Sequence, residues 1–104
     1  MENATKRRDR HEIIAEILNT AKDAKLKTHI MYKAKLSYGQ IYEYFNMLVE
    51  KGFLENTTVK RNRQILTMYR TTQKGMEFLR HMESVNKLFE QIDYGAYTKR
   101  SIEQ

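Results

Sequence analysis

The sequence contains no cysteine, and this absence excludes two kinds of site. Neither a disulfide framework nor a thiolate metal site can form in such a chain. The three histidines, His11, His29 and His81, lie far apart, and none has neighbours at metal-ligand spacing. Only a metal site that the fold assembles from distant residues stays open. We therefore expect no metal site and no cofactor.

The sequence also lacks a long apolar segment. No run approaches the roughly 18 apolar residues that a membrane-spanning helix needs. The first residues, MENATKRRDR, lack the apolar part of a signal peptide. A chain of 104 residues with 40% hydrophobic residues can form one globular domain but not two ordinary cores. We expect a soluble protein of the cytoplasm with no membrane partner.

Features that would indicate an enzyme are missing as well. The sequence has no phosphate-binding glycine loop, no cysteine nucleophile, and no histidine flanked by a plausible nucleophile and acid. We therefore expect no catalytic residues and no enzymatic activity.

Positive charge is what the sequence has in excess. Nineteen Lys and Arg against thirteen Asp and Glu give a net charge of +6. From residue 71 to 104 five bases and five acids cancel, so the whole excess lies in residues 1–70. Such a balance suits a nucleic-acid partner, which should meet that part of the chain.

The first helical pattern begins after Asp9. Asp9 followed by Glu12 is close to a capping box, which predicts a helix over residues 10–22. Its apolar stripe, expected in the core, comprises Ile13, Ile14, Ile17, Leu18 and Ala21. The preceding KRR, residues 6–8, is either a solvated terminus or an arm that contacts phosphates.

The segment KTHIMYKAKLSYGQIYEYF, residues 27–45, predicts two helices. Thr28 can cap a short first helix that turns Ile30, Met31 and Ala34 inward. Ser37 and Gln40 then have capping-box spacing. The apolar positions that follow at helical spacing are Ile41, Tyr44, Phe45, Leu48 and Val49.

One continuous helix would explain this segment less well. In one continuous helix Ser37 would not act as a cap. Gly39 would also lie in a helix interior, at a cost of ~1 kcal/mol relative to Ala. Two helices joined by a tight turn at residues 35–37 form a helix-turn-helix. We expect the second helix to end at Lys51, with Gly52 in the left-handed conformation and Phe53 against Leu48.

After the second helix, the helical spacing of apolar residues ends and residues that favour strands follow. FLENTTV (residues 53–59) and ILTMY (residues 65–69) favour strands. KRNRQ, residues 60–64, lies between them and carries three cations. We predict a β-hairpin with a basic five-residue loop. Placed directly after a helix-turn-helix, this hairpin would be a wing that contacts phosphates.

A long helix is expected to start at Thr71 and Thr72. Its apolar residues alternate at +4 and +3, as in a coiled coil. The 21 residues 72–92 would span about 30 Å, more than so small a domain covers. The alternative is a helix that packs only on its own domain. The predicted dimer interface comprises Phe78, Met82, Val85, Leu88, Phe89 and Ile92.

These elements indicate a fold that is mainly α with a small β-hairpin, a winged helix-turn-helix followed by a long C-terminal dimerisation helix. We expect a basic flexible arm at 1–8 and the DNA-binding domain at 9–75. The coiled-coil helix would occupy 72–92 and a tail 93–104.

The chain resembles the archaeal ArnR-like winged-helix family over about residues 8–92. The likeness is carried by KTHIMYKAKLSY (27–38), EKG (50–52) and YRTTQKG (69–75). It implies a small DNA-binding protein, either chromatin-associated or a transcription regulator, that dimerises through an antiparallel coiled coil. Thr71 departs from the family, in which an apolar residue is more usual, so weaker packing is expected at that strand end.

The outer face of the second helix carries the side chains suited to DNA. The amides of Gln40 and Asn46 can bond adenine edges in the major groove. Gly39 would let the backbone approach a phosphate. Glu43 either accepts from cytosine N4 or discourages non-specific binding. Met47 is expected on the same face.

The remaining candidates would contact the DNA backbone. Lys33 and Lys35, on the preceding helix, are better placed for phosphates than for bases. Tyr38 and Tyr42 either donate to phosphates or are half-buried structural tyrosines. The full set of expected DNA contacts is Thr28, Lys33, Lys35, Ser37, Tyr38, Gly39, Gln40, Tyr42, Glu43, Asn46, Lys60, Arg61, Asn62 and Arg63.

The sequence therefore predicts a homodimer that binds double-stranded DNA, as a transcriptional regulator or a nucleoid-associated architectural protein. The alternative is a protein–protein interaction adaptor on a winged-helix scaffold, because fold does not determine function. RNA binding is a weaker option, since the sequence has no RNA-type aromatic sheet motif.

Overall fold

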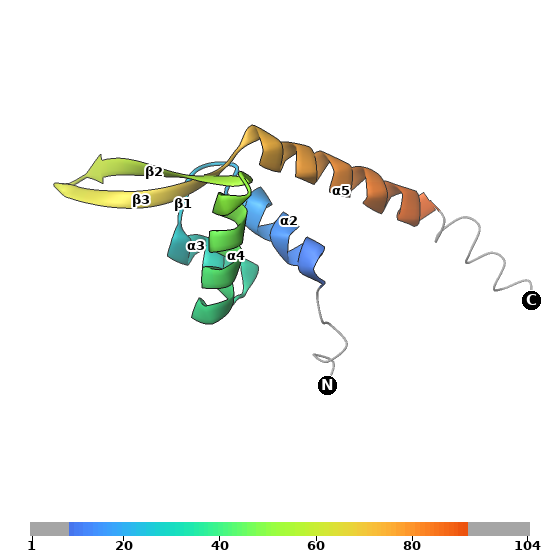
Figure 1. Ribbon diagram of the computed structural model, residues 1–104, viewed down its shortest axis with the longest axis horizontal. Helices are drawn as coiled ribbons and strands as arrows, with labels where there is room; N and C mark the ends of the chain where they lie inside the picture. Colours follow the sequence, from blue (N-terminus) through green and yellow to red (C-terminus); the bar gives the residue numbers. More distant parts are fainter. Residues whose placement is uncertain (1–8, 92–104) are drawn as a thin grey trace, which may run out of the picture.

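The computed structural model describes residues 9–91. Its elements follow in the order α2 (Arg10–Thr20), β1 (Lys25–Leu26), α3 (Lys27–Ala34), α4 (Tyr38–Glu50), β2 (Leu54–Arg61), β3 (Gln64–Thr71) and α5 (Gln73–Gln91). Helices α2, α3 and α4 form the body, while the β2–β3 hairpin and α5 extend from it in opposite directions (Figure 1). The predicted fold class is confirmed.

Helix α2 begins with the predicted cap. The Glu12 backbone N–H donates to the Asp9 carboxylate at 2.9 Å, and the Asp9 N–H donates to the Glu12 carboxylate at 3.4 Å. The helix ends at Thr20, two residues earlier than expected. Its five stripe residues are all buried in the core, as predicted.

The sheet has a third strand that the sequence did not indicate. β1 is only two residues long and pairs antiparallel with β3, so the strand order is β1-β3-β2. This pairing holds Leu26 in an extended conformation, and α3 begins directly after it. The prediction that Thr28 caps α3 is therefore wrong, because the N-cap is Leu26, which makes no side-chain capping bond.

The division of residues 27–45 into two helices is confirmed. Lys35 adopts the left-handed conformation (φ 56°) and ends α3. Ser37 then caps α4: the Gln40 N–H donates to Ser37 Oγ at 3.2 Å, and the Ser37 N–H donates to Gln40 Oε1 at 3.1 Å. Because both helix ends are satisfied locally, the turn between them is compact.

The end of α4 also follows the prediction. Gly52 has φ 84°. Its N–H donates to the Val49 carbonyl at 3.1 Å, and the Phe53 N–H donates to the Leu48 carbonyl at 2.8 Å. This pair of bonds is a Schellman motif, which reverses the chain and sends it into β2.

The hairpin differs from the prediction at its tip. The ladder continues to the pair Arg61–Gln64, which leaves only Asn62 and Arg63 in the turn, at φ 50° and 64°. A five-residue loop over 60–64 is therefore wrong. A two-residue turn with two positive φ angles matches the right-handed twist of paired strands. The strands can therefore stay paired up to the turn itself.

Thr71 is the last residue of β3 rather than the first of the helix. It is buried, and its N–H donates to the Ala21 carbonyl at 2.9 Å. Its hydroxyl donates to the Leu18 carbonyl at 2.6 Å. The expectation of weaker packing at Thr71 is wrong, because both of these bonds tie the strand end to the last turn of α2.

The start of α5 is tied to the end of α4. Thr72 Oγ1 accepts from the Gly75 N–H at 3.1 Å, which caps α5, and donates to the Gly52 carbonyl at 2.6 Å. Lys74 Nζ donates to the Lys51 carbonyl at 2.8 Å. A Cβ on Gly75 would lie 2.5 Å from the Phe53 carbonyl oxygen, so only glycine allows this approach.

We expect Gly75→Ala to lower the free energy of unfolding by about 1–3 kcal/mol, because the added methyl overpacks the α4–α5 junction. The measurement is urea denaturation. Gly39→Ala is the matched control. It is also a helical glycine, but a Cβ there meets nothing within 4 Å. That variant should gain up to about 1 kcal/mol from helix propensity. Equal stability of the two variants would contradict the close approach at Gly75.

Candidate nucleic-acid interface

Helix α4 has one buried face and one open face. Ile41, Phe45 and Leu48 anchor it in the core. The predicted DNA contacts on this helix are all exposed: Tyr38, Gly39, Gln40, Tyr42, Glu43 and Asn46. Tyr38 is 72% exposed and Tyr42 is 62% exposed, so neither is a half-buried structural tyrosine.

Met47 does not belong to the open face. The sequence placed it there, but its side chain is partly buried and packs against the core. Tyr44 and Val49 are also partly buried against the core. The buried side of α4 is therefore wider than the predicted stripe, since Met47 joins it.

The two amides of the open face are not equivalent. The Gln40 carbonyl oxygen already accepts from the Ser37 N–H in the cap. A bidentate contact with adenine uses both the oxygen and the nitrogen of an amide. Asn46 is exposed and lines a hollow of about 330 Å³ with Lys27 and Tyr69. Asn46 is therefore the better placed of the two for reading a base.

Glu43 lies on the side of α4 that faces the start of α2. Glu43 and Arg10 line one hollow of about 200 Å³, together with Tyr44 and Met47.

Helix α3 and the turn that follows it contribute a second exposed set. The predicted residues Thr28, Lys33, Lys35 and Ser37 are all exposed. The sequence reasoning missed Tyr32, which is 83% exposed. Helical spacing could have identified it, since Tyr32 lies on the side of α3 opposite the buried Ile30 and Ala34.

The β2–β3 hairpin, called the wing below, exposes all four of its predicted residues: Lys60, Arg61, Asn62 and Arg63. Directly paired residues share a sheet face. The pairs Leu54–Thr71 and Lys60–Ile65 therefore lie on one face, and Arg61–Gln64 lies on the other. Lys60 and Arg61 therefore point to opposite faces of the wing, because both belong to a strand and not to a loop.

The base of the wing is fixed against α4 by aromatic contacts. The Tyr69 ring meets the Phe45 ring edge-to-face, with centroids 4.6 Å apart. Lys27 Nζ lies 5.6 Å from the centre of the Phe45 ring and 5.7 Å from that of Tyr69. These contacts set the orientation of the wing relative to α4, so both can meet one ligand surface.

Helix α5 is buried only near its start. The Phe78 ring packs on its own domain, 5.8 Å from Phe53 and 6.2 Å from His11 between centroids. Met82 is half-buried. Further along, Leu88 and Phe89 are each 60% exposed. Val85 is also exposed, whereas Ile92, like the basic run at 6–8 and the tail at 93–104, lies outside the described residues.

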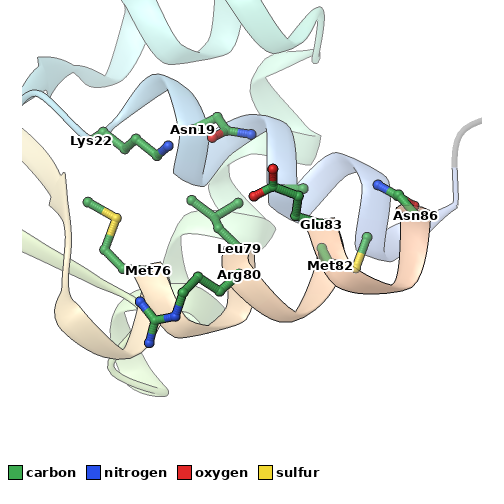
Figure 2. A pocket seen from close by; sticks show the side chains of 9 residues that line it. Asn19, Lys22, Met76, Leu79, Arg80, Met82, Glu83 and Asn86 are labelled. Carbon is green, nitrogen blue, oxygen red and sulfur yellow. The ribbon is translucent and has the colours of Figure 1, made fainter. Parts of the chain in front are cut away.

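A groove of about 440 Å³ runs between α2 and α5. Leu79 and Glu83 point from α5 toward α2, while Arg80 points away from it (Figure 2). Ala15, Met76, Leu79 and Met82 supply the apolar part of its lining. Val85, Leu88 and Phe89, which are exposed on the outer half of α5, are not part of this lining.

No helix among residues 9–91 is both long and apolar enough to cross a membrane. Among the same residues, His, Asp and Glu side chains do not gather in threes where they could hold a metal ion.

Residues 7–90 match the winged helix-turn-helix family. The chain belongs to that family. The helix-turn-helix is a DNA-binding motif whose second helix enters the major groove. In this winged helix-turn-helix protein, α4 occupies the position of the recognition helix.

Several known proteins are similar to this one. Sso10a-2, a DNA-binding protein from Sulfolobus solfataricus, is 29% identical; the match covers 90% of this chain and 94% of that one, with a TM-score of 0.71. A PadR family transcriptional regulator from Eggerthella lenta is 16% identical over 77% and 76% of the two chains, with a TM-score of 0.63, and shares the fold. An uncharacterized protein of Methanocaldococcus jannaschii is 34% identical over 59 residues, which span 56% of this chain and 61% of that protein.

We expect Gln40→Ala to lower the free energy of unfolding by about 0.5–1 kcal/mol, because it removes the bond from the Ser37 N–H to the Gln40 side chain in the α4 capping box. Asn46→Ala should leave stability unchanged and weaken binding to a preferred duplex by about 1–3 kcal/mol. Urea denaturation and fluorescence titration measure the two effects. If Asn46→Ala keeps the same ratio of affinities for the preferred duplex and for other duplexes, Asn46 does not read a base.

Proposed function

We propose that this protein is a homodimer that binds double-stranded DNA, as a transcriptional regulator or a nucleoid-associated architectural protein of the cytoplasm. Helix α4 would enter the major groove and the wing would contact the adjacent phosphates. The observation that carries the proposal is the open polar face of α4 beside a wing with three exposed cations. Residues 9–75 would form the DNA-binding domain, and α5 would form the dimer.

The distribution of charge supports DNA as the partner. All of the positive excess lies in residues 1–70, which include α3, α4 and most of the wing. Each Lys or Arg that neutralises a phosphate releases counterions, and this release drives binding. The arm at 1–8, with its KRR run, would add contacts to the same ligand.

The likeness to Sso10a-2 supports the same function, since that protein is described as DNA-binding and matches nine-tenths of this chain. We further propose membership of the archaeal ArnR-like branch, on the motifs at 27–38, 50–52 and 69–75. Much of the last two motifs has a structural role here, in the Schellman ending of α4 and the start of α5.

The exposed outer half of α5 supports dimerisation. Val85, Leu88 and Phe89 form an apolar stripe that water would otherwise cover. In an antiparallel pair, this stripe of one chain would lie beside Met82 and the α2–α5 groove of the other. The proposed interface comprises Phe78, Met82, Val85, Leu88, Phe89 and Ile92, with Phe78 at its inner edge. Two recognition helices about 34 Å apart could then occupy successive major grooves.

The same exposed stripe also favours one other function, a protein–protein adaptor whose partner covers α5. A gel-shift series at rising salt separates the two functions. A DNA-binding protein retains duplex affinity at moderate salt and loses it log-linearly as salt rises, whereas an adaptor shows no duplex affinity in moderate salt.

Replacement of Lys60, Arg61 and Arg63 by alanine should weaken binding to all duplexes. The slope of log affinity against log salt should fall by about one per lost phosphate contact. Fluorescence anisotropy at several salt concentrations measures this slope.

A control for this variant removes three cations away from the wing. Lys51, Lys74 and Lys87 are exposed residues at the end of α4 and on α5, outside the wing and the α2–α5 groove, and their replacement by alanine changes the net charge equally. The control should alter the slope much less than the wing variant does. Equal slopes for the two variants would show that the wing makes no direct contact.

Phe89→Glu should convert the dimer to monomers, because it places a carboxylate in the apolar interface. Sedimentation equilibrium measures the mass. Ser84→Glu is the control, since it adds an equal charge at an exposed position of α5 outside the +4/+3 pattern. A dimer that survives Phe89→Glu would locate the interface elsewhere.

A further inference from the structure

The tip of the wing, residues 60–65, has a turn that glycine would suit better. Both turn residues, Asn62 and Arg63, have positive φ. Turns of this type favour Asn followed by Gly, since only glycine adopts the second position without strain. The chain carries an arginine there. A cation at the outermost point of the wing is therefore present at the expense of the turn's own stability.

Ile65 is the second unusual feature of the wing tip. Its side chain is 72% exposed, whereas Val59, Leu66 and Met68 of the same hairpin are partly buried. Ile65 pairs directly with Lys60, on the sheet face that also carries Tyr69. Because Tyr69 packs on Phe45 of α4, this face of the wing is the one on the α4 side.

At the wing tip this apolar side chain has one cation directly beside it and two more close by in the chain. Lys60 is its cross-strand partner on the same face, Arg63 lies in the turn, and Arg61 lies on the opposite face. This chemistry is complementary to a ligand with anionic walls and an apolar interior. The minor groove of duplex DNA has phosphates along both edges, with sugars and base edges between them.

We propose that Ile65 is a minor-groove wedge, an inference that rests on DNA binding as the function of this protein. Its side chain would enter between two base pairs and partly unstack them. Arg63 would lie along the floor of the groove, and Lys60 and Arg61 would bind the flanking phosphates. Architectural proteins use Ile, Leu, Phe and Met in this way to bend the duplex.

Two properties of the bound DNA follow. The duplex bends at the wing, and pyrimidine–purine steps are preferred there because they unstack easily. The guanine N2 amino group projects into the minor groove and obstructs the floor. A·T pairs are therefore preferred beneath the wing, although no major-groove contact exists there.

The first test is Ile65→Thr, which keeps a β-branched residue in the strand and removes the apolar end. Energy transfer between dyes at the two duplex ends measures the bend. The bend should decrease, and affinity for a duplex with a TA step beneath the wing should fall about tenfold, as expected for one good base contact. Leu66→Thr, on the other sheet face, should retain both. An unchanged bend and affinity in Ile65→Thr would overturn the proposal.

The second test changes the DNA. Replacing G·C by inosine·cytosine removes the N2 amino group and leaves the major-groove edge unaltered. Beneath the wing, this exchange should tighten binding roughly three- to tenfold. Arg63→Gly, which suits the turn better, should lose that gain while remaining folded. The same exchange beneath α4 should have no effect. The absence of a response at every wing position would overturn the proposal.

A failure of DNA binding and a failure of the wedge would give different results. If no duplex binds at physiological salt, DNA binding itself is wrong, and the wedge with it. If duplexes bind and the wing alanine variant loses affinity, but neither bending nor inosine has an effect, only the wedge is wrong. In that case the wing lies on the phosphates outside the groove.

Discussion

The hydrogen bonds of Thr71 to the last turn of α2 are the constraint on which the arrangement of this protein depends. Its N–H and its hydroxyl donate to the carbonyls of Ala21 and Leu18. Carbonyls at a helix C-terminus lack partners within the helix and cost free energy when buried unpaired. Because β3 ends and α5 begins at this point, one buried residue orients the wing, the long helix and the three-helix body relative to one another.

The candidate DNA-binding surface depends on a second contact, the edge-to-face packing of Tyr69 on Phe45. Phe45 belongs to the buried face of α4, so its ring determines the direction in which the open face points. Tyr69 belongs to the base of the wing, so its ring determines where the cations of the tip are carried. Together they fix the base of the wing against α4.

The features that could be predicted from sequence are those set within one turn of chain. Both capping boxes, at Asp9 and Ser37, and the Schellman ending at Gly52 were predicted and confirmed. Each arises from groups three to five residues apart, so the local sequence is sufficient to specify it. The apolar stripes of α2 and α4 were also correct, since a 3.6-residue period defines a face.

Several of the wrong predictions concern residues whose structure depends on strand pairing. β1 consists of two residues without a pattern of their own, and only pairing with β3 makes them a strand. That pairing moved the N-cap of α3 from the predicted Thr28 to Leu26. The short turn at the wing tip likewise reflects the full ladder between β2 and β3. Gln40 was expected both to complete the cap of α4 and to read bases, and the structure shows its side-chain oxygen accepting from the Ser37 N–H.

The sequence by itself determined the helix limits near caps, the buried faces of the helices and the location of the positive charge. The tertiary structure alone decided that Thr71 is anchored, that Gly75 must be glycine, and that Ile65 stands exposed beside Lys60. The physical reason is distance along the chain. A helix cap joins residues three apart, whereas Thr71 meets Leu18 across 53 positions. Burial at such a contact depends on how separate elements pack, which no local pattern encodes.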